Sequence, residues 1–316
     1  MEKQAAADPA TRVTILMGVH NGAAHLAAQL DSFAAQSHAG WRLVASDDGS
    51  TDGSGEILDA FARGQPSGRV ELIAGPGRGH AANYLHLLRR LPAGDGDWLA
   101  FSDQDDVWLP ERLATGIAAL RDTAGPALHC SRTLICSERL EGQRLSPPRP
   151  RPPGFRNALV QNIAAGNTIL LNPTGARLLA TAARRIEATV VHDWLAYQVI
   201  SGAGGRVVHD DRPGLLYRQH GRNAIGANDG LRSRLRRMRM LMDGTMRGWT
   251  DVNLAALHAI RDLLGEEERA LAEAFAALRR EPGSLRRLRL FRRLGLYRQS
   301  RSSTLALWWG VLTGRV

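Results

Sequence analysis

The chain has 316 residues, of which 44% are hydrophobic and 23% charged, an ordinary globular composition that allows one large α/β domain and a smaller appendage. We expect neither a signal peptide nor a membrane span, because the first dozen residues lack an apolar core and no apolar run reaches roughly 18 residues. The net charge of +10 lies almost wholly in residues 231–316, which hold 18 arginines and only 8 acidic residues.

Strand-like and helix-like patterns alternate through the first two thirds of the chain. The strand-like runs are short and apolar, and the runs between them have helical periodicity. This alternation is typical of crossover units around a mainly parallel sheet. We expect strands at 13–19, 41–45, 70–73, 98–101, 169–171 and 214–217, and helices at 23–36, 52–62, 79–88, 110–121, 173–185 and 194–201.

The segment 146–154 (SPPRPRPPG) contains five prolines and cannot form a regular element. Because apolar periodicity resumes after it, we interpret it as an excursion inside one domain, such as a loop over a site. We therefore predict one α/β domain over 12–228 and a basic α-helical region over 229–316. Cys130 and Cys136 have no CxxC spacing, and we expect buried free thiols on one strand, as suits a reducing cytoplasm.

Polar side chains follow three of the expected strands, at the ends where open α/β sheets bind ligands. His20 and Asn21 follow the first strand, 46–52 (SDDGSTD) follows the second, and 102–106 (SDQDD) follows the fourth. Acidic residues at successive strand ends are unlike a phosphate-binding glycine loop. The run 75–79 (GPGRG) does not match GxGxxG, so a dinucleotide-binding dehydrogenase is disfavoured.

Asp103 and Asp105 stand two residues apart, directly after an apolar strand. Two hard oxygen ligands suit Mg²⁺ or Mn²⁺, which take their remaining ligands from water and substrate phosphates. Such an ion would bridge a diphosphate and neutralise the charge that grows as the diphosphate leaves. A solvated acidic turn is the alternative that this spacing alone leaves open.

Three segments in order resemble the successive signatures of the family 2 glycosyltransferases. They are 13–38 (VTILMGVHNGAAHLAAQLDSFAAQSH), 44–54 (VASDDGSTDGS) and 101–113 (FSDQDDVWLPERL). The resemblance covers roughly 12–225 and is nearest to the rhamnosyltransferase-like members, which carry the SDQDDxW form. It implies a GT-A fold, which is a Rossmann-like, mainly parallel sheet flanked by helices, and an inverting transfer from a nucleotide-sugar donor.

The resemblance also implies roles for individual residues. Asp48 is expected to recognise the nucleotide base, and Asp103 and Asp105 to hold the metal and the donor diphosphate. Further donor contacts are expected at His20, Asn21, Arg78 and Asn83.

An inverting transfer needs a general base. The family places an acid in an (E/H)D-W motif, which corresponds here to His192-Asp193-Trp194 and makes Asp193 the expected base. Asp193 also precedes an expected helix, so helix capping is the alternative interpretation.

The run 217–223 (YRQHGRN) resembles the terminal signature of the family. We expect His220 to complete the metal shell or touch the diphosphate, and Arg222 to pair with phosphate; a structural histidine and a solvated arginine are the alternatives. The segment 162–167 (NIAAGN) resembles the one that backs the donor sugar and acceptor. Gly166 would permit a close backbone approach there, although an ordinary turn would also explain it.

The basic region carries two apolar features. From 231 to 246 one helical stripe is apolar and lies away from several arginines, so this helix could bind an anionic membrane or pack on the main domain. The run 305–312 (LALWWGVL) is too short to span and could enter one leaflet or close a core. We predict a peripheral protein at the cytoplasmic face of a membrane. The members of the apolar stripe are Leu231, Leu235, Met238, Met242 and Met246.

Other protein classes and other substrates remain as alternatives. A nucleotidyltransferase would need a basic residue where HNGAAH stands, and a nucleic-acid-binding protein fits the pI near 10.9 but not the near-neutral main domain. We expect no nucleic-acid partner. The resemblance favours dTDP-L-rhamnose as donor, with a UDP-hexose as the alternative, and a glycan or polyprenyl-linked glycan as acceptor.

Overall fold

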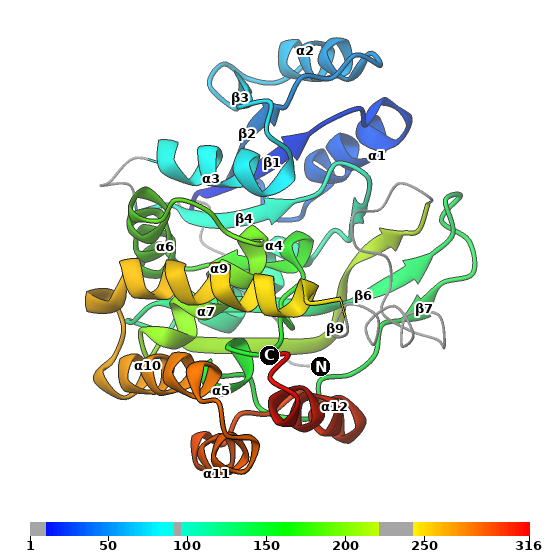
Figure 1. The fold of residues 1–316 in the computed structure, drawn as a ribbon. Helices are drawn as coiled ribbons and strands as arrows, with labels where there is room; N and C mark the ends of the chain where they lie inside the picture. The colour runs from blue at the N-terminus through cyan, green and yellow to red at the C-terminus, as the bar shows by residue number, and fades with distance from the viewer. Residues whose placement is uncertain (1–10, 92–95, 221–242) are drawn as a thin grey trace.

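The computed structural model describes residues 11–91, 96–220 and 243–316. These residues form one nine-stranded sheet in the order β3-β2-β1-β4-β8-β6-β9-β5, with β7 paired to β6 (Figure 1). The fold class is therefore α/β, as predicted. The strands are β1 (Val13–Val19), β2 (Trp41–Asp47), β3 (Val70–Ala74), β4 (Trp98–Ser102), β5 (Val107–Trp108), β6 (Ala127–Cys136), β7 (Arg144–Leu145), β8 (Leu170–Leu171) and β9 (Arg206–Arg218).

Helices cover both faces of the sheet (Figure 1). The bounds predicted for α6 are confirmed in full, and the others are close to those observed. The helices are α1 (Ala23–Ala34), α2 (Ser54–Arg63), α3 (His80–Arg90), α4 (Arg112–Leu120), α5 (Phe155–Ala158), α6 (Pro173–Arg185), α7 (His192–Gly202), α9 (Thr245–Ala259), α10 (Glu266–Arg280), α11 (Ser284–Leu294) and α12 (Arg301–Leu312), with short 3₁₀ turns at Gly166–Thr168 and Arg261–Leu263.

The first four strands are parallel and carry the site. β1 pairs with β2 and β4, and β2 pairs with β3, all in parallel register. Successive side chains of β1 enter different cores, with Leu16 on one face and Ile15 and Met17 on the other. A strand buried on both faces explains the continuous apolar run in the sequence. The carboxyl ends of these strands meet at one edge.

The second half of the sheet is mixed. β8 runs antiparallel to β4 and β6, while β6 and β9 run parallel to each other through a register irregularity at Ser131 and Arg132. β9 begins at Arg206, eight residues before the predicted strand at 214–217. The first half of β9 is mostly polar and exposed or half-buried, so the sequence shows no apolar alternation there. This half is a strand because it pairs with the buried strand β6.

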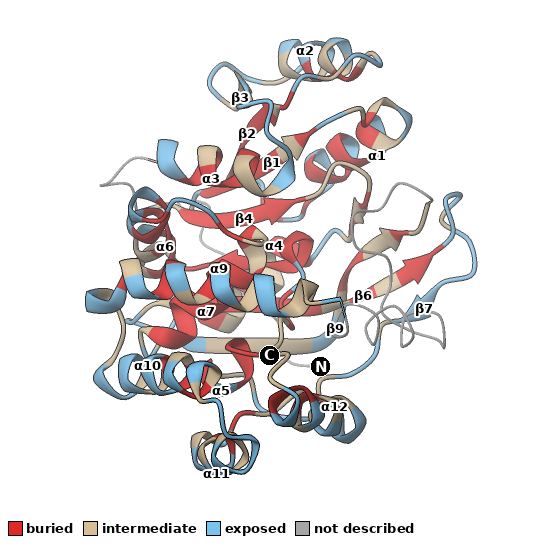
Figure 2. Cartoon of the chain, in the orientation of Figure 1, coloured by how far each residue is buried: buried red, intermediate tan, exposed pale blue. Residues whose placement is uncertain are grey.

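The C-terminal helices share a core with the α/β part. Phe275, Phe291 and Val311 belong to the same buried cluster as Leu195 and Ile200 of α7. Figure 2 shows that the buried side of these helices faces the rest of the molecule and the exposed side faces solvent. The predicted boundary at residue 229 lies outside the described residues. Among the helices that the structure describes, none is long and apolar enough to cross a membrane.

The proline-rich segment packs against the C-terminal region. The Arg151 N–H donates to Gln299 Oε1 at 2.9 Å, and the Tyr297 hydroxyl donates to the Pro152 carbonyl at 2.6 Å. The Arg151 guanidinium also lies 4.0 Å from the centre of the Tyr297 ring. The segment thus joins the α/β part to the turn before α12, a role that the sequence did not indicate. The two cysteines are buried free thiols on β6, as predicted.

Candidate active site

Three acidic side chains gather where β4 ends. β4 is buried throughout, and the chain turns directly after Ser102 at the carboxyl edge of the parallel strands. Each of Asp103, Asp105 and Asp106 offers a carboxylate oxygen within 4.8 Å of the others. The acidic turn of the sequence is therefore a compact cluster, and we call these three residues the acidic cluster.

The electrostatics of the acidic cluster favour a bound cation. Burial raises the pKa of Asp103 well above its usual range, and the neighbouring charges of Asp106, Asp105 and Asp193 raise it further. Burial, followed by the charge of Asp105, raises the pKa of Asp106 to about 7. Carboxylates brought together in this way repel one another, and a divalent ion with hard oxygen ligands relieves the repulsion. The donor set fits Mg²⁺ or Mn²⁺.

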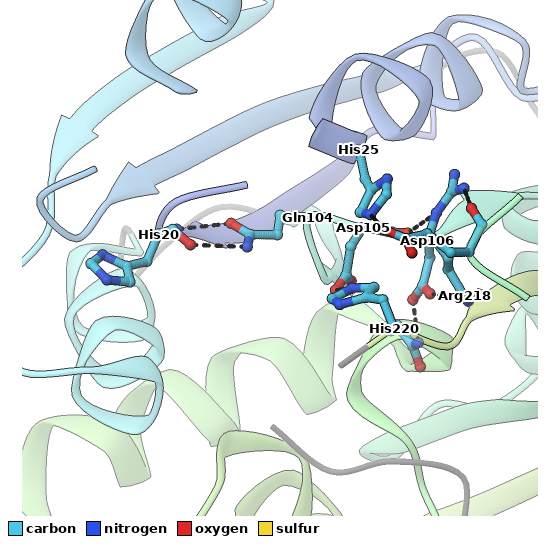
Figure 3. Close-up of polar contacts among 9 residues, drawn as sticks. His20, His25, Gln104, Asp105, Asp106, Arg218 and His220 are labelled. Atoms are coloured by element: carbon cyan, nitrogen blue, oxygen red, sulfur yellow. Dashed lines mark hydrogen bonds and ion pairs between the residues drawn. The ribbon is translucent and has the colours of Figure 1, made fainter. Parts of the chain in front are cut away.

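Asp106 is fully buried and fixes the acidic cluster in place. Its two oxygens accept hydrogen bonds from the Asn167 amide and, at 3.1 Å, from the Arg218 backbone N–H. The Arg218 side chain donates to the Asp105 carbonyl at 2.8 Å (Figure 3). Neither Asp106 nor Arg218 was among the site residues predicted from the sequence. The third aspartate of SDQDD was the available signal.

His220 lies against the acidic cluster from the other end of the chain. Its Nε2 is 2.8 Å from Asp105 Oδ2, because the end of β9 passes beside the turn after β4 (Figure 3). The ring of His25, from α1, lies 5.1 Å from the ring of His220. The structure thus brings His220 into contact with Asp105, whereas the oxygens that gather within 4.8 Å of one another belong to the three aspartates alone among the described residues. The role of His220 as a metal ligand stays a prediction.

Gln104 fastens the acidic cluster to the loop after β1. Its amide oxygen accepts the His20 N–H at 2.8 Å, and its amide nitrogen donates to the His20 carbonyl at 3.0 Å (Figure 3). A Cβ on Gly22 would lie 2.5 Å from the Gln104 amide carbon, so a larger residue there would displace the Gln104 amide from its hydrogen bonds to His20. The His20 side chain is exposed and open to a ligand.

Asn21 joins the loops after β1 and β2. Its backbone has a φ of 49°, its N–H donates to Ser50 Oγ at 2.9 Å, and its side-chain oxygen accepts the Thr51 N–H at 2.9 Å. Asparagine tolerates this left-handed conformation better than most residues. Its role at the site is therefore at least partly structural.

Asp48 holds the loop between β3 and α3. Its two carboxylate oxygens accept the backbone N–H groups of Gly77 at 2.7 Å and Gly79 at 2.8 Å. A carboxylate has about four acceptor positions, so Asp48 can still accept from a ligand. Recognition of the nucleotide base by Asp48 stays a prediction. The base would have to donate to the acceptor positions of the carboxylate that Gly77 and Gly79 leave free.

The other predicted donor contacts differ in exposure. Asn83 is buried, and its amide accepts from the Ser46 hydroxyl at 2.5 Å and donates to the Ser46 carbonyl at 3.0 Å, which favours a structural role. Arg78 is exposed on the loop that Asp48 organises. Arg222 lies outside the described residues.

Asp193 lies in the first turn of α7. The N-cap residue of α7 is Val191, so Asp193 does not occupy the capping position. Its carboxylate accepts the Trp194 N–H at 2.6 Å and the Gly166 N–H at 3.1 Å. Burial raises the pKa of Asp193 to about 6, although these hydrogen bonds lower it. A carboxyl group with this pKa is suited to general base catalysis near neutral pH.

The residue before Asp193 packs in a cluster of aromatic rings. His192 is buried among His80, Tyr84 and Phe101, and burial, with a further contribution from His80, lowers its pKa well below the usual range. A Cβ on Gly166 would lie 2.6 Å from His192 Nε2, so the backbone at this glycine lies close to the start of α7, while its predicted approach to the donor sugar and acceptor stays a prediction. The segment 162–167 therefore packs directly on the turn that carries Asp193.

Comparison with known proteins identifies the family. The profile of Glycosyl transferase family 2 matches residues 14–172, which is half of the chain and includes the acidic cluster. The chain belongs to this family.

The names of two similar proteins specify different donors. The dTDP-rhamnosyl transferase RfbG of Shigella flexneri is 22% identical over 231 residues, which are 70% of this chain and 78% of that protein. The UDP-Glc:α-D-GlcNAc-diphosphoundecaprenol β-1,3-glucosyltransferase WfgD of Escherichia coli is 24% identical over 51% of this chain and 62% of that protein. The putative glycosyltransferase EpsE of Bacillus subtilis is 32% identical, and the chain spans half of its length.

Solved structures support the fold. S. aureus TarS 1–349 in complex with UDP-GlcNAc matches with a TM-score of 0.53 and 14% identity, over 84% of this chain and 71% of that chain. At this identity the likeness shows the fold alone, and that fold is the GT-A type expected from the sequence.

Proposed function

We propose that this family 2 glycosyltransferase is metal-dependent and inverting, with Asp193 as the general base. The observation that carries the proposal is the position of the Asp193 carboxylate, which accepts the N–H groups of Gly166 and Trp194 and lies close enough to the acidic cluster for its charge to raise the pKa of Asp103. Asp193 would take the proton of an acceptor hydroxyl as its oxygen bonds to the anomeric carbon. The bond from that carbon to the diphosphate breaks on the opposite face, which inverts the configuration.

Asp103 and Asp105 would hold Mg²⁺ or Mn²⁺, with His220 as a third ligand. When bound, the ion would supply a positive charge that stabilises the diphosphate as it leaves. The observation behind this assignment is the repulsion within the acidic cluster. Asp106 would position the turn, since both of its oxygens already accept hydrogen bonds from the protein.

The nucleotide would lie over the loops after β1 and β2. Asp48 would bind the base, while His20 and Arg78 have the exposure that a contact to ribose or phosphate requires. The name of RfbG supports dTDP-L-rhamnose as the donor, and the names of WfgD and TarS keep a UDP-sugar as the second candidate. Incubating the protein with a panel of sugar nucleotides and measuring released nucleoside diphosphate tests both. The proposal is contradicted if the protein hydrolyses neither donor class.

The acceptor would be a glycan or a polyprenyl-linked glycan. The name of WfgD, which includes a diphosphoundecaprenol acceptor, supports this class. A lipid-linked acceptor would require the enzyme to work at a membrane surface, and the charge of residues 231–316 supports a peripheral association at the cytoplasmic face. Membership of Glycosyl transferase family 2 favours a transferase over a nucleic-acid-binding protein, the alternative that the pI near 10.9 suggested.

A further inference from the structure

The helices α11 and α12 expose an unusual number of large apolar side chains. Leu285 is 72% exposed, Leu305 69%, Trp309 40% and Leu312 39%. Of the large hydrophobic side chains exposed in the described part of the chain, Leu145 is the only other one. Both helices lie at the end of the molecule opposite α2 (Figure 1). Exposed apolar residues gathered in one place indicate an interaction surface.

The exposed residues of α12 form one stripe. Leu305, Trp309 and Leu312 follow the i, i+4, i+7 spacing of a single helix face, while Leu307 and Val311 on the other side are buried in the core. Packing of α12 on the protein therefore explains only one of its two apolar faces. The outward stripe remains exposed in the described part of the chain, where the Arg315 guanidinium lies 5.8 Å from the centre of the Trp309 ring.

The stripe is surrounded by positive charge. From Pro282 to Val316 the chain contains eight arginines and no acidic residue. The exposed residues of α11 are Ser284, Leu285 and four arginines, and Arg301 is exposed at the start of α12. Glu281, just before α11, forms an ion pair with Arg286 at 3.7 Å. The exposed arginines of α11 are Arg286, Arg289, Arg292 and Arg293.

Contacts between α11 and α12 hold the two helices together. Arg287 donates to the Val311 carbonyl at 2.9 Å and to the Leu312 carbonyl at 2.8 Å, which holds the end of α12 beside the start of α11. Trp308 packs edge-on against Phe291, with ring centroids 4.7 Å apart. Binding through these two helices would therefore not have to order them first.

We propose that α11 and α12 form the membrane-docking surface, with Leu285, Leu305, Trp309 and Leu312 entering the headgroup region and the exposed arginines binding anionic lipid. The inference rests on the proposed membrane association and assigns it to α11 and α12, while most of the predicted stripe at 231–246 lies outside the described residues. Tryptophan and leucine beside arginine match the interface of an anionic bilayer. A nucleic acid would pair with the arginines but would leave the apolar stripe in water.

Vesicle flotation of the full chain tests the assignment. We expect the wild-type protein to float with vesicles containing phosphatidylglycerol, to release at high salt, and to ignore pure phosphatidylcholine. The double variant Leu305→Ser/Trp309→Ser should lose binding at least about tenfold, because it removes two apolar side chains from the interface. Leu145→Ser, at an exposed leucine on β7, is the matched control and should float like the wild type.

A charge-matched pair tests the arginines. Arg292→Gln/Arg293→Gln should weaken binding to anionic vesicles, whereas Arg63→Gln/Arg121→Gln, which removes the same charge from exposed sites elsewhere, should not. The inference is wrong if the wild type does not bind anionic vesicles, if Leu305→Ser/Trp309→Ser binds like the wild type, or if all binding is to nucleic acid in a gel shift. Donor hydrolysis measured without vesicles is independent, so loss of docking and absence of transferase activity are distinguished.

Discussion

The ring of His192 lies flat on the ring of Tyr84, with centroids 3.6 Å apart and planes 8° apart. The Tyr84 hydroxyl donates to the Ser102 carbonyl at 2.5 Å, one residue before Asp103. His192 in turn directly precedes Asp193. The stack therefore connects the acidic cluster to the proposed base through buried side chains, and it sets the distance between them.

Tyr84→Phe is expected to slow catalysis without removing a catalytic group. The ring would still stack, but the buried Ser102 carbonyl would lose its hydrogen-bond donor, at a cost of about 1–3 kcal/mol in the free energy of unfolding. We expect kcat to fall more than donor affinity. Tyr297→Phe, which loses a hydrogen bond to Pro152 far along the chain from the acidic cluster, is the control. An equal effect of both variants on kcat would contradict the connection.

Asp105→Asn should remove most of the activity while keeping the size of the side chain. Without this charge the acidic cluster binds a divalent ion less well, and we expect a loss of turnover of about a hundredfold or more. A chelator should abolish wild-type activity, and Mn²⁺ or Mg²⁺ should restore it. Asp59→Asn, at an exposed aspartate on α2, should leave activity unchanged. Full wild-type activity in excess chelator would refute the metal assignment.

Asp193→Asn should reduce turnover by at least about a hundredfold, which is the usual scale for the loss of a general base. Donor binding should be nearly unchanged, since Asp193 would act on the acceptor. Titration calorimetry with the nucleoside diphosphate, alongside initial rates, separates the two quantities. A variant that remained active but less stable would make Asp193 a structural residue.

The pH dependence of wild-type activity should follow the carboxyl group of Asp193. Its pKa of about 6 means that the base is protonated at lower pH, so kcat should fall as pH decreases through 6 and be level above it. Because the folded pKa is raised, wild-type stability should decline as pH rises from about 4 to 6, by about 1–3 kcal/mol from this group. Asp193→Asn should show a smaller decline than the wild type, because only the contribution of this group is removed while Asp103 and Asp106 keep raised pKa values, and thermal unfolding across this range will measure the difference.

The sequence predicted the strands and helices whose own pattern of apolar residues determines their secondary structure. The continuous apolar runs of β1 and β4 required burial on both faces, so both strands and the polar turns after them were predictable. β9 was only partly predicted, because its polar first half is fixed by pairing with β6 and not by its own periodicity.

The sequence predicted several residues of the candidate site but not the hydrogen bonds between them. The spacing of Asp103 and Asp105 indicated the acidic cluster, whereas the bonds of Asp106 come from Asn167 and Arg218, which are distant in sequence. Long-range hydrogen bonds leave no periodic pattern. For the same reason, the structural contacts of Asp48 could not be predicted from its motif.

Gly166→Ala tests how closely the segment 162–167 must approach the proposed base. The added methyl group would lie 2.6 Å from His192 Nε2 and 3.3 Å from the Asp193 Cβ, both too close for ordinary packing. His192 is buried in its aromatic cluster and cannot move away cheaply, so the segment or the first turn of α7 must shift. Overpacking of this kind costs about 1–3 kcal/mol of stability.

The shift should also move Asp193, whose carboxylate accepts the Gly166 N–H. We therefore expect kcat to fall in Gly166→Ala while metal binding, which depends on the turn after β4, is retained. Gly125→Ala is the matched control, because a Cβ there meets no atom within 4 Å. Initial rates, metal titration and thermal unfolding of both variants distinguish the outcomes. Wild-type kcat in Gly166→Ala would show that the position of Asp193 does not depend on this contact, and would weaken its assignment as the base.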